Sequence, residues 1–150
     1  MVSGSGFALQ AVRIVLGFIL ALVGAGVFLV FGFFQALTAD SEPGVAVAVI
    51  AAGLVSSALI GALAFVPACF AIVLAESFRW RSAVYHIAIG GLIAFVIWGF
   101  GETSAGNAGD NAALRPGTTI ALAAGFVAGA IYWLVAGRLS GTWHRPEQGA

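Results

Sequence analysis

Charged residues are scarce in this 150-residue chain, and lysine is missing altogether. Six arginines and six acidic residues make up 8% of the sequence, whereas a soluble domain carries about 25% charged residues. Long apolar segments separate these charges, so that 61% of the residues are hydrophobic and the mean hydropathy is +1.08. These figures exclude a soluble globular domain, and lipid is the expected solvent for most of the chain.

Other absences exclude particular kinds of partner and fold. The net charge is zero, and no basic cluster offers the lysines and arginines with which proteins neutralise nucleic-acid phosphates. Cys69 is the single cysteine, so no intramolecular disulfide can form, and the sequence has no Cys/His zinc pattern. The 21 glycines follow no G-X-Y period, which excludes a collagen-like chain.

Four apolar segments are long enough to cross a bilayer as helices, which takes about 20 residues. They cover residues 7–37, 44–75, 83–101 and 117–137. None of them alternates apolar and polar residues as the strands of a membrane barrel do. The expected fold is therefore an all-α membrane protein with one four-helix transmembrane bundle. Residues 102–116 are expected to form an external loop, and residues 138–150 a cytoplasmic tail.

The positions of arginine predict how the bundle is oriented, because cytoplasmic loops carry an excess of Lys and Arg. Arg79 and Arg81 lie between the second and third segments, and Arg138 and Arg145 follow the fourth. The other connections carry mainly acids, namely Asp40, Glu42, Glu102 and Asp110. We therefore expect both termini in the cytoplasm. The first segment exceeds the 7 to 15 apolar residues or so of a signal peptide, so we expect it to stay in the protein.

Small residues at every fourth position mark the faces that are expected to hold the helices together. Helices in lipid associate by close approach of their backbones, which small side chains permit. The predicted packing residues are Gly17, Ala21 and Ala25 in the first segment, Gly53, Ser57 and Gly61 in the second, and Gly117, Ala121, Gly125 and Gly129 in the fourth. Homodimerisation through the same faces is the alternative interpretation.

Arginine and aromatic residues gather at the expected cytoplasmic rim. One interpretation is a belt that fixes the depth of the helices in the bilayer. The other is a docking surface for anionic lipid headgroups or for a cytoplasmic partner. The candidate docking residues are Arg13, Glu76, Arg79, Trp80, Arg81, His86, Arg138, Trp143 and Arg145.

The apolar segments offer little that could carry chemistry. No acidic residue lies near the middle of any segment, so the buried carboxylate of a proton-coupled exporter is missing. His86 lies one turn into the third segment, where we expect a hydrogen-bonded or lipid-facing residue rather than a metal or haem ligand. Ser56 and Ser57 have no neighbouring base to activate them. We therefore expect a non-enzymatic protein without a cofactor or a metal.

Two hypotheses of function follow. The first is a small integral membrane protein that acts as a structural, accessory or assembly subunit of a membrane complex. Its partners would be the lipid bilayer and other membrane-protein subunits, or a second copy of itself. The second is an oligomeric channel or facilitator for a small neutral solute, with a pore lined by Ser56, Ser57 and glycines. Abundant Ala, Gly and Val without Lys indicate a bacterial source and hence the inner membrane.

Overall fold

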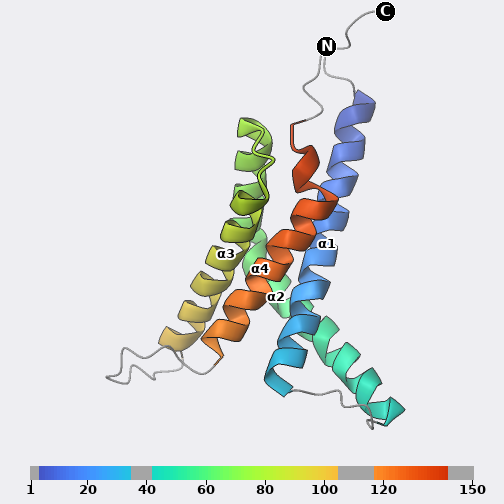
Figure 1. Cartoon of the computed structure of the whole chain (residues 1–150), viewed down its shortest axis with the longest axis vertical. Helices are drawn as coiled ribbons and strands as arrows, with labels where there is room; N and C mark the ends of the chain where they lie inside the picture. Colours follow the sequence, from blue (N-terminus) through green and yellow to red (C-terminus); the bar gives the residue numbers. More distant parts are fainter. Residues whose placement is uncertain (1–3, 35–41, 105–116, 142–150) are drawn as a thin grey trace, which may run out of the picture.

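Four long helices make up nearly all of the chain that the structure describes. The computed structural model describes residues 4–34, 42–104 and 117–141. Their helices are α1 (Gly4–Phe34), α2 (Pro43–Phe78), α3 (Ala83–Ser104) and α4 (Thr118–Val135), followed by the short 3-10 helix η1 (Gly137–Leu139) (Figure 1). No strand occurs in these ranges, and all four long helices are long and apolar enough to cross a membrane. The chain is thus an all-α, multi-pass membrane protein.

The helices differ from the predicted segments only at their ends. α1 begins earlier than predicted, at Gly4, while α2 continues to Phe78 and α3 to Ser104. Hydropathy locates the apolar part of a helix, but its backbone hydrogen bonds continue into the polar interface. α4 is shorter than predicted and stops at Val135. The predicted external loop thus begins inside α3, and its remainder, like residues 35–37 and 142–150, lies outside the described residues.

A proline starts α2, and a residue in the left-handed backbone conformation ends it. Pro43 occupies the first turn of α2, where its missing N–H group would have no helical partner. α2 ends because Arg79 adopts a left-handed conformation with φ of 57°, and the Trp80 N–H group donates to the Ala75 carbonyl at 2.9 Å. The left-handed backbone conformation costs a residue with a side chain about 1–2 kcal/mol. The surrounding contacts therefore have to hold Arg79 in it.

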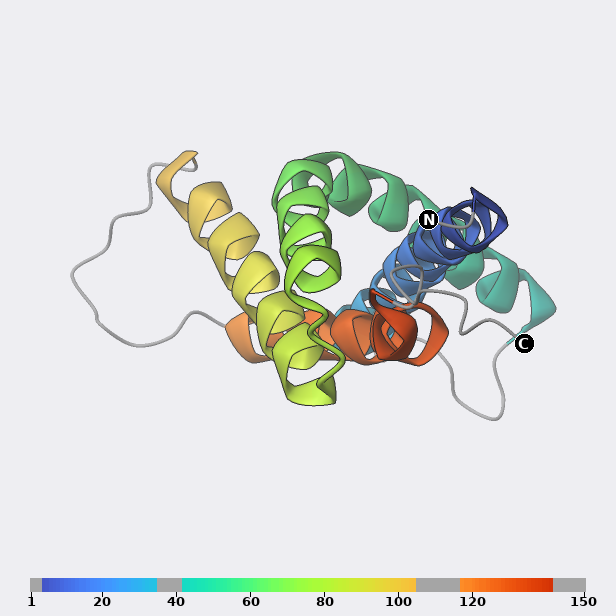
Figure 2. The same ribbon diagram turned by 90° about the horizontal axis from the view of Figure 1, so that it is seen from above.

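The helices form an open arc in which α4 contacts both α1 and α3, and α1 also contacts α2. α2 and α3 contact each other far less, although a short connection joins them. Pro67 lies inside α2 and removes one of its backbone donors. The axis of α2 changes direction along its length when the bundle is seen from above (Figure 2).

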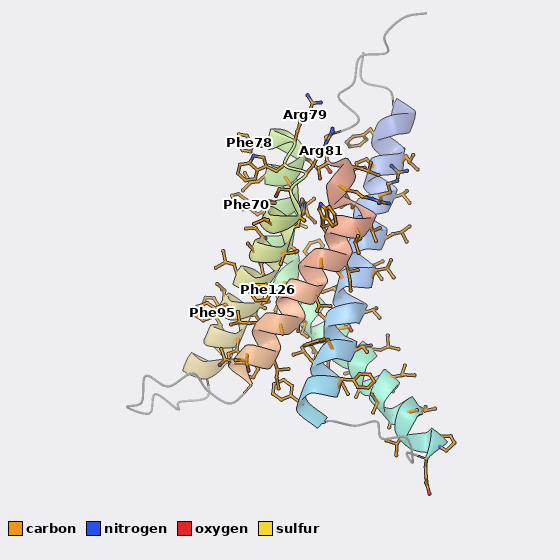
Figure 3. The ribbon with its side chains drawn as sticks, in the orientation of Figure 1. Phe70, Phe78, Arg79, Arg81, Phe95 and Phe126 are labelled. Atoms are coloured by element: carbon orange, nitrogen blue, oxygen red, sulfur yellow. The ribbon has the colours of Figure 1, made fainter. Side chains whose placement is uncertain are left out.

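Large apolar side chains point away from the bundle, and small ones fill it. Phe70, Phe95 and Phe126 project outward and are 68%, 51% and 44% exposed (Figure 3). The buried apolar residues are mostly alanines, namely Ala21, Ala25, Ala64, Ala75, Ala121, Ala124 and Ala136. This distribution suits a bundle whose outer surface is solvated by lipid and whose helices approach closely.

The start of α1, the α2–α3 connection and η1 lie at the same end of the bundle (Figure 1). We call this end the arginine end, because Arg79, Arg81 and Arg138 lie there. At the opposite end the Trp98 Nε1–H group of α3 donates to Thr118 Oγ1 of α4 at 3.1 Å. That the arginine end faces the cytoplasm remains a prediction.

Candidate functional site

Glycines allow two helix pairs to approach until their backbones touch. At the α3–α4 crossing, Gly90 lies against the Gly125 carbonyl and the backbone of Gly129. At the α1–α2 crossing, Gly26 lies against the Gly53 carbonyl and the Ser57 side chain. A Cβ atom at Gly90 or Gly26 would collide with these groups, so each crossing requires glycine.

Most of the predicted packing residues lie inside the bundle. Gly117 is half-buried before α4, and the other nine are buried: Gly17, Ala21, Ala25, Gly53, Ser57, Gly61, Ala121, Gly125 and Gly129. Several of these residues pack against residues outside the predicted set rather than against one another. A Cβ atom on Gly17 would lie 3.3 Å from that of Ala136, and Gly61 faces Leu22.

Sequence reasoning missed Gly26 and Gly90, which complete the two closest crossings. Gly26 follows Ala25 directly and therefore falls outside the four-residue spacing of its helix. Gly90 belongs to a pair of glycines in α3, a helix in which no stripe was predicted. The presence of a glycine in an apolar segment, whatever its spacing from other small residues, is the signal that could have found them.

Glu76 ties three parts of the chain together at the arginine end. Gln10 Nε2 of α1 donates to Glu76 Oε1 at 2.7 Å, and the Gly141 N–H group donates to Glu76 Oε2 at 2.7 Å. Gln10 is only 3% exposed. Hydrogen bonds to an ionised carboxylate are among the stronger ones in proteins, so Glu76 fixes both α1 and the segment after η1 to α2.

The α2–α3 connection is braced by further contacts. Arg81 Nε donates to the Ser140 carbonyl at 2.9 Å, while the Arg81 carbonyl accepts a hydrogen bond from Trp133 Nε1 at 2.8 Å. The Trp80 ring lies edge to face with that of Tyr85, with 4.7 Å between the ring centroids. The connection is therefore held both to α4 and to the segment that follows η1.

His86 is buried between two tyrosines. Its ring stacks on Tyr132 with centroids 5.6 Å apart and meets Tyr85 edge to face at 5.1 Å. His86 Nδ1 lies 2.9 Å from the Ser82 carbonyl, and because a carbonyl only accepts hydrogen bonds, Nδ1 carries a proton. The buried Nε2 has no hydrogen-bond partner among the described residues.

The predicted docking residues separate into two groups. Arg79, Trp80, Arg81 and Arg138 are exposed at the arginine end, and Figure 3 shows Arg79 and Arg81 beside Phe78 at the end of the bundle.

The remaining predicted docking residues are not exposed, or lie outside the described residues. Glu76 and His86 are directed into the contacts described above, and Arg13 is half-buried on α1. Trp143 and Arg145 lie outside the described residues. Sequence reasoning did not single out Gln10, Ser140 or Gly141, whose roles depend on partners far away in the chain.

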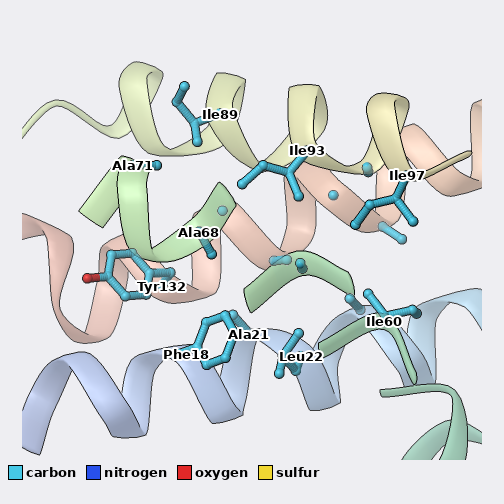
Figure 4. Close-up of a pocket in the computed structure, with 18 of the residues that line it drawn as sticks. Phe18, Ala21, Leu22, Ile60, Ala68, Ala71, Ile89, Ile93, Ile97 and Tyr132 are labelled. Carbon is cyan, nitrogen blue, oxygen red and sulfur yellow. The ribbon is translucent and has the colours of Figure 1, made fainter. Parts of the chain in front are cut away.

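An apolar cavity of about 250 Å³ lies among the four long helices (Figure 4). It extends from Phe33 and Trp98 to His86 and Tyr132 at the arginine end, and most of its lining is alanine, glycine and isoleucine. A second apolar cavity of about 280 Å³ lies between α2 and α3, beside Pro67. Both cavities follow the side of the bundle on which α2 and α3 scarcely touch.

Two of the predicted pore residues lie away from this cavity. Ser57 Oγ donates to the Gly53 carbonyl of its own helix at 2.6 Å, and neither Ser56 nor Ser57 lines the cavity. Within the described ranges no three His, Cys, Asp or Glu residues are grouped so that they could hold a metal ion. No protein-family model, curated protein or solved structure matches the chain.

Proposed function

We propose that the protein is a non-enzymatic accessory or assembly subunit of a membrane complex and that it binds its partner through the exposed α2–α3 connection. The observation that carries this proposal is the bracing of residues 79–82. Arginines that only set the depth of a helix extend flexibly to the headgroups and need no fixed backbone. Here the side chain and the carbonyl of Arg81 are both hydrogen-bonded, and Arg79 is held in a left-handed conformation.

A fixed backbone favours binding, because less conformational freedom is lost when the partner associates. The exposed surface is cationic, since it carries Arg79, Arg81 and Arg138. Among the described residues of the same end, Glu76 is acidic, and it points inward to Gln10 and Gly141. The complementary partner is therefore a protein with an acidic surface, whose carboxylates the planar guanidinium groups would bind in pairs of hydrogen bonds.

The location of this complex follows from the same arginines. Because positively charged connections stay in the cytoplasm, the arginine end would face the cytoplasm and the partner would present its acidic surface there. The composition supports a bacterial inner membrane as the location.

Native mass spectrometry of the tagged full chain in mild detergent tests this proposal. We expect a complex of fixed stoichiometry with one identifiable membrane protein. The triple variant Arg79→Gln, Arg81→Gln, Arg138→Gln should insert normally but run as the free chain. Arg13→Gln is the matched control and should keep the complex. A complex that survives in the triple variant would overturn the proposal, and loss of bound anionic lipid alone would assign the surface to headgroups.

A further inference from the structure

We infer that the cavity among the four helices binds one hydrocarbon chain of a lipid, which reaches it from the bilayer between α2 and α3. The cavity is lined along α3 from His86 to Trp98 and along α4 from Ala121 to Tyr132. At 1.5 Å per helical residue, these stretches are roughly 17 Å long. The cavity is therefore elongated along the bundle.

The volume of the cavity decides between a chain and a helix as its occupant. Spread over a length of roughly 17 Å, the volume of about 250 Å³ gives the cavity a mean cross-section of about 15 Å², whereas a helix about 10 Å in diameter has a cross-section of about 80 Å². A helix from a partner or from a second copy of this chain is therefore too large. An apolar cavity of about 150 Å³ is already sufficient to bind benzene, so a thin, apolar chain suits the larger space.

The lining requires an apolar occupant. Ala68 and Ala71 of α2 and Ile89, Ile93 and Ile97 of α3 line the cavity together (Figure 4). None of these side chains offers a hydrogen bond, so a polar solute would lose its hydration without compensation. A hydrocarbon chain has no hydration to lose when it moves into the cavity from the bilayer.

The open side of the bundle provides the route. α2 and α3 scarcely contact each other, and Tyr85 Oη donates to the Ala71 carbonyl at 3.0 Å near the connection that joins them. The second cavity lies between the same two helices, and both cavities share the lining residues Ala71, Tyr85, Ile89 and Ile93. A lipid chain therefore passes from the bilayer to the interior without leaving an apolar environment.

His86 closes the arginine end of the cavity. It lines the cavity there and is only 6% exposed. A Cβ atom on Gly137 would lie 2.7 Å from His86 Nε2, so Gly137 packs directly against this edge of the ring and leaves no space for a polar head. The cavity therefore takes up the hydrocarbon chain alone, and the head of the lipid stays outside it.

Photolabelling of the full chain in lipid nanodiscs tests the inference. The two probes are palmitic acid with a diazirine in its chain and a phosphatidylglycerol with the same labelled chain. We expect saturable labelling within residues 64–72 and 89–97 that unlabelled palmitate or phosphatidylglycerol competes away. Labelling by the first probe alone identifies a free fatty acid, and labelling by the second alone identifies a membrane phospholipid, and either supports the site.

Two phenylalanine substitutions on α2, one inside the cavity and one outside it, provide the control for this labelling. Ala68→Phe fills the cavity and should lower saturable labelling at least fivefold. Ala62→Phe adds the same ring at an exposed position of α2 and should leave the labelling unchanged. Thermal unfolding confirms that each variant is folded, and Ala71→Phe replaces Ala68→Phe if that variant does not insert. Labelling that does not saturate with either probe, or that is equal in a folded cavity-filled variant and in Ala62→Phe, would overturn the inference.

Discussion

The α3–α4 pair and the α2–α3 pair are both consecutive in the chain, but only the first is closed by backbone contact. Gly90 of α3 touches the backbone of Gly125 and Gly129, whereas Ala68 of α2 and Ile93 of α3 line the cavity among the four helices. Lipid solvates large apolar side chains as well as another helix does, so adjacency in sequence does not bring helices together. Close contact of two backbones requires small residues where the helices cross.

The distribution of glycine within α2 fits this difference. The part of the helix before Pro67 contains Gly53 and Gly61, which face α1. From Pro67 to Phe78 the helix contains no glycine, and this is the part that runs beside α3 toward the connection. The same helix therefore packs closely on one neighbour and leaves an apolar gap beside the other.

The largest effect is expected where the close crossing is blocked. Gly90→Ala places a methyl group against the Gly125 carbonyl, so α3 and α4 have to separate, and the free energy of unfolding should fall by about 3 kcal/mol. Denaturation by SDS, followed by circular dichroism, measures this loss.

Gly99→Ala is the matched control in the same helix, because its added Cβ atom would meet nothing within 4 Å. Alanine is the better helix former by about 0.8–1 kcal/mol, so this variant should be as stable as the wild type or more so. Equal losses for the two variants would show that the crossing does not depend on Gly90.

A smaller loss is expected at the polar contacts of the arginine end. Glu76→Ala removes the acceptor for Gln10 and for the Gly141 N–H group and should cost about 2 kcal/mol. Hydrogen exchange should accelerate in residues 137–141, which Glu76 ties to α2. Glu76→Gln keeps one carbonyl acceptor and should lose about half as much. Unchanged protection in Glu76→Ala would mean that Glu76 does not hold this segment.

Arg79→Gly should separate stability from partner binding. Glycine adopts the left-handed conformation of residue 79 without strain, so the free energy of unfolding should rise by about 1 kcal/mol. The same change removes a cation from the proposed docking surface and should weaken the complex in native mass spectrometry. A lower melting temperature would show that contacts of the Arg79 side chain outweigh the backbone strain.

The smallest effect is expected for Ser57→Ala. The Ser57 hydroxyl donates to a carbonyl of its own helix, and such bonds contribute little to the association of helices, so the change should stay below about 0.5 kcal/mol. Ser57→Val adds bulk against Gly26 and should destabilise the α1–α2 pair more strongly. A change in solute flux in liposomes carrying Ser57→Ala would instead favour the channel hypothesis.

The sequence predicted the four membrane helices because hydropathy over about 20 residues needs no knowledge of neighbouring helices. It did not predict that Gly26 meets Ser57 or that Gly90 meets Gly129, because pairing depends on how each helix is rotated about its axis. In a chain with 21 glycines, many faces satisfy the four-residue spacing. Nor did it predict the burial of Gln10, whose partner Glu76 lies 66 residues further along the chain.

The central claim is that small residues bring some helix pairs into close contact, while α2 and α3 stay apart. Disulfide trapping in native membranes tests this claim most directly. In a Cys69→Ser background, one protein carries Gly17→Cys with Ala136→Cys, whose Cβ positions lie 3.3 Å apart, near the usual disulfide spacing of about 3.8 Å. The other carries Ala68→Cys on α2 with Ile93→Cys on α3, two positions that both line the cavity. We predict that copper phenanthroline oxidises only the first pair to a disulfide. A disulfide in the second pair and none in the first would contradict this account.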